Sequence, residues 1–327
     1  MNSKNDKMKY IVGAYATAPS TVAWDKYLES EYYQQLKMAN NIKGIEHPFV
    51  GTLHPYDDTW FLANVDPNWQ FIFTSIPGVM ANLGTNPHFG IASNDIAGRL
   101  AALDFYQQAR QAIIQLNQHL ARPAVSHIKI HTAPKISATV SSSPQALEAS
   151  LLTMQSWDWQ EAKLVIEHCD AFIPEQAAEK GFLLLEDEIA TVTKVNSALN
   201  ADIGISINWG RSAIETQSVR GPLEHIKMAY QSKLLKGIIF SGASAKDTPY
   251  GQWKDSHMPP AYALNIPHFA DDSLLTFEQI EKSLQQCNSE ALDFIGGKIS
   301  LRPNNASVAD RSSYIQSLLT LLDKANI

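Results

Sequence analysis

Short apolar runs alternate along the chain with longer stretches of helical period, which is the pattern of repeated strand–helix units. Most of these runs carry Ile, Val or Phe at successive positions, as parallel strands buried on both faces do. The pattern predicts eight strands, over residues 10–16, 42–49, 69–77, 126–133, 162–170, 202–210, 235–243 and 293–301. It predicts helices over residues 25–40, 57–65, 96–120, 144–156, 175–199, 222–234, 276–288 and 308–325.

This order of elements predicts an α/β fold of the (β/α)8 TIM barrel type. The chain has 327 residues, which is enough for one large barrel. No sequence repeat, low-complexity tract or linker interrupts the series, so we expect a single domain over residues 1–327. Residues 1–8 are mostly polar and are expected to form a flexible extension before the first strand.

Charge and composition exclude several classes of function. The formal net charge is −7, and no run of Lys or Arg forms the basic face that a duplex nucleic acid selects. The two cysteines, Cys169 and Cys287, form no CxxC pair, which argues against a disulfide framework or a structural zinc site of cysteines. No apolar stretch approaches the roughly 20 residues that span a bilayer. We therefore expect a cytoplasmic protein without a membrane or nucleic-acid partner.

Polar side chains stand where the predicted strands end. In a (β/α)8 barrel the carboxyl ends of the strands and the loops that follow them build the active site. The candidates at the strand ends are Glu46, His131, Glu167, Asn208, Arg211 and Arg302. The long loops over 50–68, 76–95 and 243–275 add His88, Trp253, Asp255 and His257.

Side chains alternate along a strand, so Glu167 and His168 cannot both face the barrel axis. We expect Glu167 to face inward, because a carboxylate on the apolar helix side would lack a partner. Some candidates also have a purely structural interpretation. Glu46 could pair with Lys43, His131 could be a satisfied core histidine, and each arginine could pair with a local acid. The acidic run over 186–188 is expected on the solvated face of a helix.

The order of these motifs resembles that of the xylose isomerase-like superfamily, which includes sugar isomerases, epimerases, inosose dehydratases and apurinic endonucleases. The segment FGIASNDIAGRLAALDFYQQA resembles the stretch before the third helix of that group, with Arg99 where an arginine often stands. SHIKIHTAP resembles its fourth strand and ends near His131. KLVIEHCD resembles its fifth strand, and the resemblance implies that Glu167 binds a metal or abstracts a proton.

The chain departs from the superfamily at the last three strands, where relatives commonly supply metal ligands. Relatives end the sixth strand with D-x-x-H, whereas this chain has NWGR, with Asn208 and Arg211 in those places. The seventh strand offers Ser241 or Ser244 in place of a histidine, and the eighth offers Arg302 in place of a glutamate. Asp255-Ser256-His257 resembles the D-x-H ligand pair of apurinic endonucleases.

These exchanges replace negative charges with positive ones. A divalent ion within ~4 Å of an arginine is repelled by at least a few kcal/mol even at an effective dielectric near 20. The cofactor is therefore left open, with Glu167, Asp255 and His257 as the remaining candidate ligands of a divalent metal. The same exchanges favour an anionic ligand, because guanidinium groups bind carboxylate and phosphate through two hydrogen bonds.

The favoured hypothesis is an isomerase or epimerase of a small anionic sugar, sugar acid or sugar phosphate. Glu167 would abstract a proton next to a carbonyl, with His131 or His257 as the complementary acid. The substrate would be bound by Glu46, His88, Asn208, Arg211, Trp253 and Arg302. The alternatives are a metal-dependent hydrolase or dehydratase of the same fold and a non-catalytic sugar-binding or regulatory protein. A homo-oligomer is expected only from the resemblance.

Overall fold

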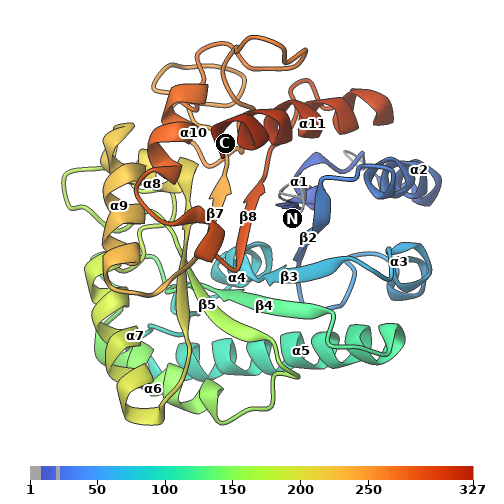
Figure 1. Ribbon diagram of the computed structural model, residues 1–327. Helices are drawn as coiled ribbons and strands as arrows, with labels where there is room; N and C mark the ends of the chain where they lie inside the picture. The colour runs from blue at the N-terminus through green and yellow to red at the C-terminus, as the bar shows by residue number, and fades with distance from the viewer. Residues whose placement is uncertain (1–8, 20–22, 327) are drawn as a thin grey trace, which may run out of the picture.

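Eight parallel strands form a closed barrel in chain order, and the last pairs with the first (Figure 1). The computed structural model describes residues 9–19 and 23–326, so the predicted extension over 1–8 lies outside the described residues. The strands are β1 (Tyr10–Val12), β2 (Ile42–Pro48), β3 (Gln70–Thr74), β4 (Val125–Ile130), β5 (Lys163–His168), β6 (Gly204–Asn208), β7 (Leu235–Phe240) and β8 (Phe294–Gly297). The predicted TIM barrel is confirmed.

The longer helices surround the strands, as Figure 1 shows. They are α1 (Ala14–Thr17), α2 (Lys26–Lys37), α3 (Asp58–Asn64), α4 (Ile76–Leu83), α5 (Ile96–Leu120), α6 (Pro144–Gln155), α7 (Leu185–Leu199), α8 (Trp209–Thr216), α9 (Arg220–Gln231), α10 (Phe277–Leu284) and α11 (Val308–Ala325), with a short 3-10 turn at Ser289–Ala291. Each predicted helix occurs, whereas α1, α4 and α8 were not predicted. No helix in the described part of the chain is both long and apolar enough to cross a membrane.

Several helices begin at side chains that bond to their first backbone amides. Asp95 accepts a hydrogen bond from the amide of Gly98 at the start of α5. Ser307 and Asp310 form a reciprocal capping box at the start of α11. Ser143 caps α6, whose first residue is a proline. These local signals explain why the predicted starts of α5, α6 and α11 agree with the structure.

The region before α7 differs from the prediction in two ways. The helix predicted over 175–199 begins only at Leu185, because the preceding residues form an irregular loop. The side chain of Asp170 holds this loop by accepting hydrogen bonds from the amides of Lys180 and Gly181. The expected solvated position of Glu188 is wrong, since this residue is 0% exposed and bonds to His168.

The interior of the barrel contains an apolar layer apart from the main core. It consists of Ile11, Ile72, Ile239 and Phe294, which come from four different strands. The ammonium nitrogen of Lys129 lies 5.4 Å from the centre of the Phe294 ring, so charged side chains directly adjoin this layer. The main core lies between the strands and the helices, and it includes Ile128 and Ile130 of β4.

Replacing Phe294 by Ala should lower the free energy of unfolding by about 3–5 kcal/mol, because it leaves a cavity in the barrel interior. Urea denaturation followed by circular dichroism measures this loss. Leu100→Ala is the control, since Leu100 is 59% exposed on α5 and its loss should stay within about 0.5 kcal/mol. Equal losses in the two variants would contradict a close-packed interior layer.

Candidate active site

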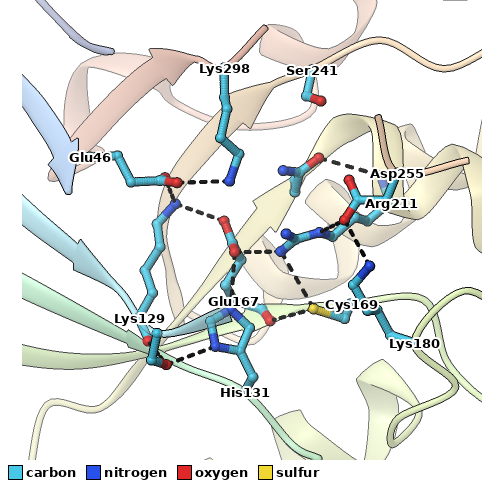
Figure 2. Close-up of polar contacts among 12 residues, drawn as sticks. Glu46, Lys129, His131, Glu167, Cys169, Lys180, Arg211, Ser241, Asp255 and Lys298 are labelled. Atoms are coloured by element: carbon cyan, nitrogen blue, oxygen red, sulfur yellow. Dashed lines mark hydrogen bonds and ion pairs between the residues drawn. The ribbon is translucent and has the colours of Figure 1, made fainter. Parts of the chain in front are cut away.

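One lysine joins two carboxylates across the carboxyl-end half of the barrel (Figure 2). The Lys129 Nζ atom lies 2.5 Å from Glu46 Oε2 and 2.7 Å from Glu167 Oε1. The three side chains come from β4, β2 and β5, and all are buried. The prediction that Glu167 faces inward is confirmed by these contacts, and His168 faces the helices instead.

Lys298 adds a second cation to Glu46. It follows β8 directly, and its Nζ atom lies 2.7 Å from Glu46 Oε1 and 3.3 Å from the Tyr15 hydroxyl oxygen. Each oxygen of Glu46 therefore has its own ammonium group. Burial alone would raise the pKa of Glu46, but Lys129 and Lys298 outweigh it and lower the pKa below its usual value. Glu46 is therefore a carboxylate at neutral pH.

Arg211 extends the network toward the loop after β7. The Asn208 side chain caps α8 by accepting a hydrogen bond from the Arg211 amide. The Arg211 Nη1 atom donates to Glu167 Oε2 at 2.5 Å, and Nε donates to Asp255 Oδ2 at 3.0 Å. Lys180 also pairs with Asp255, at 3.2 Å. Burial opposes ionisation of Glu167 and Asp255, yet Arg211 and the nearby lysines hold both pKa values well below the usual range.

Two histidines adjoin the carboxylates. His131 Nε2 lies 3.1 Å from Glu167 Oε2, and its Nδ1 lies 3.0 Å from the Ser75 hydroxyl. Burial outweighs the attraction of Glu167 and lowers the pKa of His131 to about 4. His257 Nδ1 lies 3.1 Å from the Ser241 hydroxyl, and burial lowers its pKa to about 3. Both rings are therefore neutral at neutral pH.

The resemblance implies a divalent metal at this end of the barrel, but the donor set does not fit one. Arg211 bridges Glu167 and Asp255, which are two of the three predicted ligands. Lys129 holds the other oxygen of Glu167. A divalent ion placed among these groups would have to displace a buried guanidinium or sit ~4 Å from it, where repulsion is about 8 kcal/mol at a dielectric of 20. Protein cations occupy the positions that a metal would need.

A cavity of about 310 Å³ adjoins the charged network. Glu46 is the network carboxylate that lines it, together with Tyr15 of α1, Tyr33 of α2 and other side chains from β2 and the loop after β2. The Tyr56 ring also lines the cavity and stacks on Trp24, with ring centres 5.5 Å apart. A small cavity with aromatic and aliphatic walls and two carboxylates, Glu29 and Glu46, is typical of a site for a small ligand.

The structure brings together most of the predicted site residues. They are Glu46, His131, Glu167, Asn208, Arg211, Asp255 and His257. The Asn208 Nδ2 atom is a buried donor without a partner among the described residues. His88 and Trp253 are half-buried in their loops, and in the described chain neither forms a hydrogen bond or ion pair with the network.

The expected placement of Arg302 is corrected. Its side chain is exposed, donates to Asn304 and lies over the Tyr250 ring, 5.6 Å from the ring centre. The reason is the length of β8, which ends at Gly297 rather than at the predicted residue 301. Lys298 therefore takes the inward position at the strand end, and Arg302 falls in the following loop.

Sequence reasoning missed the lysines of the network. Lys129 lies two residues before His131, so the alternation that placed His131 on the inner face also placed Lys129 there. Lys298 lies four residues after Phe294 and shares its face for the same reason. A lysine within an otherwise apolar strand was the available signal.

Comparison with known proteins places the chain in a family. Residues 11–314 match the family described as "Domain of unknown function (DUF4862)". The chain belongs to this family. A curated relative of this DUF4862 chain, "Uncharacterized protein STM3670" of Salmonella typhimurium (strain LT2), is 33% identical over 317 residues, which are 97% of either protein.

Solved structures share the fold of this DUF4862 chain. L-ribulose 3-epimerase is 13% identical, with a TM-score of 0.58 over 98% of this chain and 95% of the other. D-psicose 3-epimerase is 12% identical, with a TM-score of 0.55 over 97% and 99%. A xylose isomerase-like TIM barrel/4-hydroxyphenylpyruvate dioxygenase fusion protein is 11% identical, with a TM-score of 0.54 over 98% of this chain and 43% of that one. The fold is therefore a TIM barrel similar to that of these proteins.

Replacing Lys129 by Met should lower the free energy of unfolding by about 3–5 kcal/mol at neutral pH, because it leaves one buried oxygen of Glu46 and one of Glu167 without a cation. Lys129 depresses the folded-state pKa of both carboxylates, so its stabilisation is present above their unfolded pKa of 4.5. It is lost as the pH falls through the depressed values. Removing Lys129 raises the folded-state pKa values of the two carboxylates. The difference in free energy of unfolding between the variant and the unmodified protein should therefore become smaller toward about pH 5.

Urea denaturation at the two pH values measures this effect. Lys254→Met is the matched control, because Lys254 pairs with Glu179 on the surface and its removal should cost less than about 1 kcal/mol. A Lys129→Met loss that does not change with pH would argue against the buried carboxylates as its cause.

Proposed function

We propose that this protein is an isomerase or epimerase of a small anionic carbohydrate, such as a sugar acid or sugar phosphate, that moves a proton on a carbon next to a carbonyl. One observation carries the proposal. Glu46, with an ammonium group on each oxygen, lines the aromatic cavity. A proton acceptor and the cations that stabilise developing negative charge therefore lie side by side.

The chemistry follows from the position of these charges. Glu46 takes the proton from the substrate carbon, so the C–H electron pair moves into an enediolate and the negative charge passes from the carboxylate to the substrate oxygen. Lys298 faced the carboxylate before this step and faces the oxyanion after it. The net charge of the site does not change in this step, so the activation free energy of proton abstraction stays low in a desolvated site. Return of the proton to the former carbonyl carbon, with transfer of the hydroxyl proton between the two oxygens, gives the isomer, whereas the epimer requires a proton donor on the opposite face of the enediolate.

Glu167 takes a supporting role in this proposal. Its oxygens are held by Lys129, Arg211 and His131, and it is not among the side chains that line the cavity. A carboxylate with three such partners has little basicity left for a substrate proton. It is therefore a positioning residue that fixes Lys129, while Glu46 is the proposed base.

Two further groups complete the proposed site. His257 is neutral, its side chain is 15% exposed, and its Nδ1 is held by Ser241 and Asp255. A ring with a pKa of about 3 is a weak base, so its proposed role is a hydrogen bond to the substrate through its other nitrogen rather than proton transfer. Arg211 is saturated by two carboxylates, so Lys298 and the unpartnered Asn208 Nδ2 are the donors proposed for the anionic part of the substrate.

Solvent exchange tests the reaction class and the base together. The protein is incubated in D2O with a panel of ketoses, aldoses, sugar acids and sugar phosphates, and loss of the proton next to the carbonyl is followed by NMR. Glu46→Gln should slow the exchange by about 10²–10⁴-fold, the usual contribution of a general base. Glu29→Gln, which alters the other carboxylate of the cavity, should slow it less than about 10-fold.

The outcomes are distinct. A larger loss in Glu167→Gln than in Glu46→Gln would assign the proton transfer to Glu167. Saturable binding of a sugar without exchange would overturn the proposed enzyme and favour a binding protein.

A second prediction uses the pH dependence of the reaction. Lys298 lowers the pKa of Glu46, so Lys298→Met should shift the acid limb of the kcat/KM profile to higher pH. The same variant should reduce kcat by about 10²–10³-fold, because it removes one donor to the oxyanion. Lys298→Arg should restore part of the rate and the position of the acid limb. An unshifted limb in Lys298→Met would show that Glu46 is not the titrating base.

A further inference from the structure

A second buried polar cluster lies on the outer face of β5, behind the barrel mouth. His168 Nε2 lies 2.9 Å from Glu215 Oε2 on α8, and His225 Nε2 of α9 lies 3.6 Å from Glu215 Oε1. One nitrogen or oxygen atom from each of these three residues falls within 4.8 Å of the others. All three side chains are buried, and they come from β5, α8 and α9, whose ribbons are labelled in Figure 1.

The other nitrogen of each ring is held by a partner. His168 Nδ1 lies 2.8 Å from Glu188 Oε2, and Thr132 donates to the second oxygen of Glu188 at 2.6 Å. His225 Nδ1 lies 2.9 Å from the Ser212 hydroxyl. Such contacts fix the tautomer and direct the second nitrogen, and metal-binding histidines almost always have them. Both Nε2 atoms are directed at the Glu215 carboxylate.

The charges of the cluster are not balanced by protein cations. Within the described residues, Glu188 and Glu215 form ion pairs with histidines and with no lysine or arginine. A divalent ion beside two neutral rings would offset both negative charges, and buried charge of this kind is costly when uncompensated.

The geometry points to a binding site for one zinc-like divalent transition-metal ion, held by His168, Glu215 and His225. Two imidazoles and one carboxylate suit first-row transition metals better than Mg²⁺ or Ca²⁺, which prefer oxygen ligands. Ligand atoms at 2.0–2.1 Å from a tetrahedral ion are about 3.3 Å apart. The 2.9 Å and 3.6 Å separations at Glu215 lie on either side of that value.

The site would link the outer face of β5 to α8 and α9. Arg211 and Glu215 belong to the same helix, and Glu167 and His168 are adjacent in β5. An ion here would therefore fix both elements that carry the Glu167–Arg211 pair of the barrel mouth, without touching the substrate cavity. This inference is independent of the proposed reaction.

Metal titration of the full chain tests the site. The protein is stripped with a chelator and dialysed, and then titrated with Co²⁺ while its visible absorption is recorded. We expect the protein to bind about one equivalent of Co²⁺, with the visible absorption intensity of a low-coordinate Co²⁺ site. Zn²⁺ should displace the Co²⁺ and remove this absorption. Zn²⁺ should also raise the Tm of the stripped protein. His225→Gln should abolish the Co²⁺ bands and the rise in Tm.

Two control variants locate the ion. His127→Gln alters another buried histidine, which pairs with Asp293 at 3.0 Å, and should keep the bands. Asp255→Asn alters the barrel mouth and should also keep them. Loss of the bands in Asp255→Asn but not in His225→Gln would place the ion in the barrel mouth. If the unmodified protein binds no Co²⁺, the cluster is a hydrogen-bond network and not a metal site. Either result would overturn the inference.

A spectroscopic measurement covers the case in which His225→Gln does not fold. X-ray absorption of the Co²⁺-loaded unmodified protein counts the imidazole ligands. The cluster behind β5 supplies two imidazoles, whereas Glu167, Asp255 and His257 of the barrel mouth supply one. Two imidazoles support the inference, and one contradicts it.

Discussion

The ammonium group of Lys129 lies between the carboxylates of Glu46 and Glu167, and the order of the barrel mouth depends on this contact. A charge this deeply buried must be paired, since its desolvation costs several kcal/mol. The contact ties β2, β4 and β5 together, and Lys298 and Arg211 extend it to the end of β8 and the start of α8. Every charge in the network is therefore held in place by its neighbours. Such preorganised charges need no rearrangement when a substrate charge develops beside them.

The two faces of β5 have opposite electrostatic character. Glu167 faces inward, where cations surround the carboxylates, and His168 faces outward, where carboxylates surround an imidazole. The two-residue period of the strand produces this difference between adjacent positions. It also explains where side chains are available to bind a metal ion. Inside the barrel their lone pairs are taken by Lys129, Lys298 and Arg211, whereas behind β5 the carboxylates pair with imidazoles and accept hydrogen bonds from the Thr132 hydroxyl and the Ala171 amide.

The fold could be predicted from the sequence because its signals are local. Apolar runs, helical periodicity and caps such as Asp95 and Ser307 determine most elements, and the bounds of α5 and α11 agree with the prediction. The site was predicted less completely, because its contacts join residues far apart in the chain. Lys129 and Glu46 are separated by 83 positions, and only the register of the barrel brings them together. Arg302 was expected in the site because the end of β8 is set by tertiary packing rather than by a local stop signal.

The use of protein cations in place of a metal also limits the chemistry that the barrel mouth can perform. A metal ion lowers the pKa of bound water to about 7 and so generates a hydroxide for hydrolysis. An ammonium group cannot polarise water to this extent. It can, however, pair with a carboxylate before proton transfer and with a nearby substrate oxyanion afterwards. Proton transfer next to a carbonyl requires only such a displacement, between Glu46 and an oxygen in the adjoining cavity. The lysines of the network therefore favour isomerisation or epimerisation over the metal-dependent hydrolysis that the same fold could support.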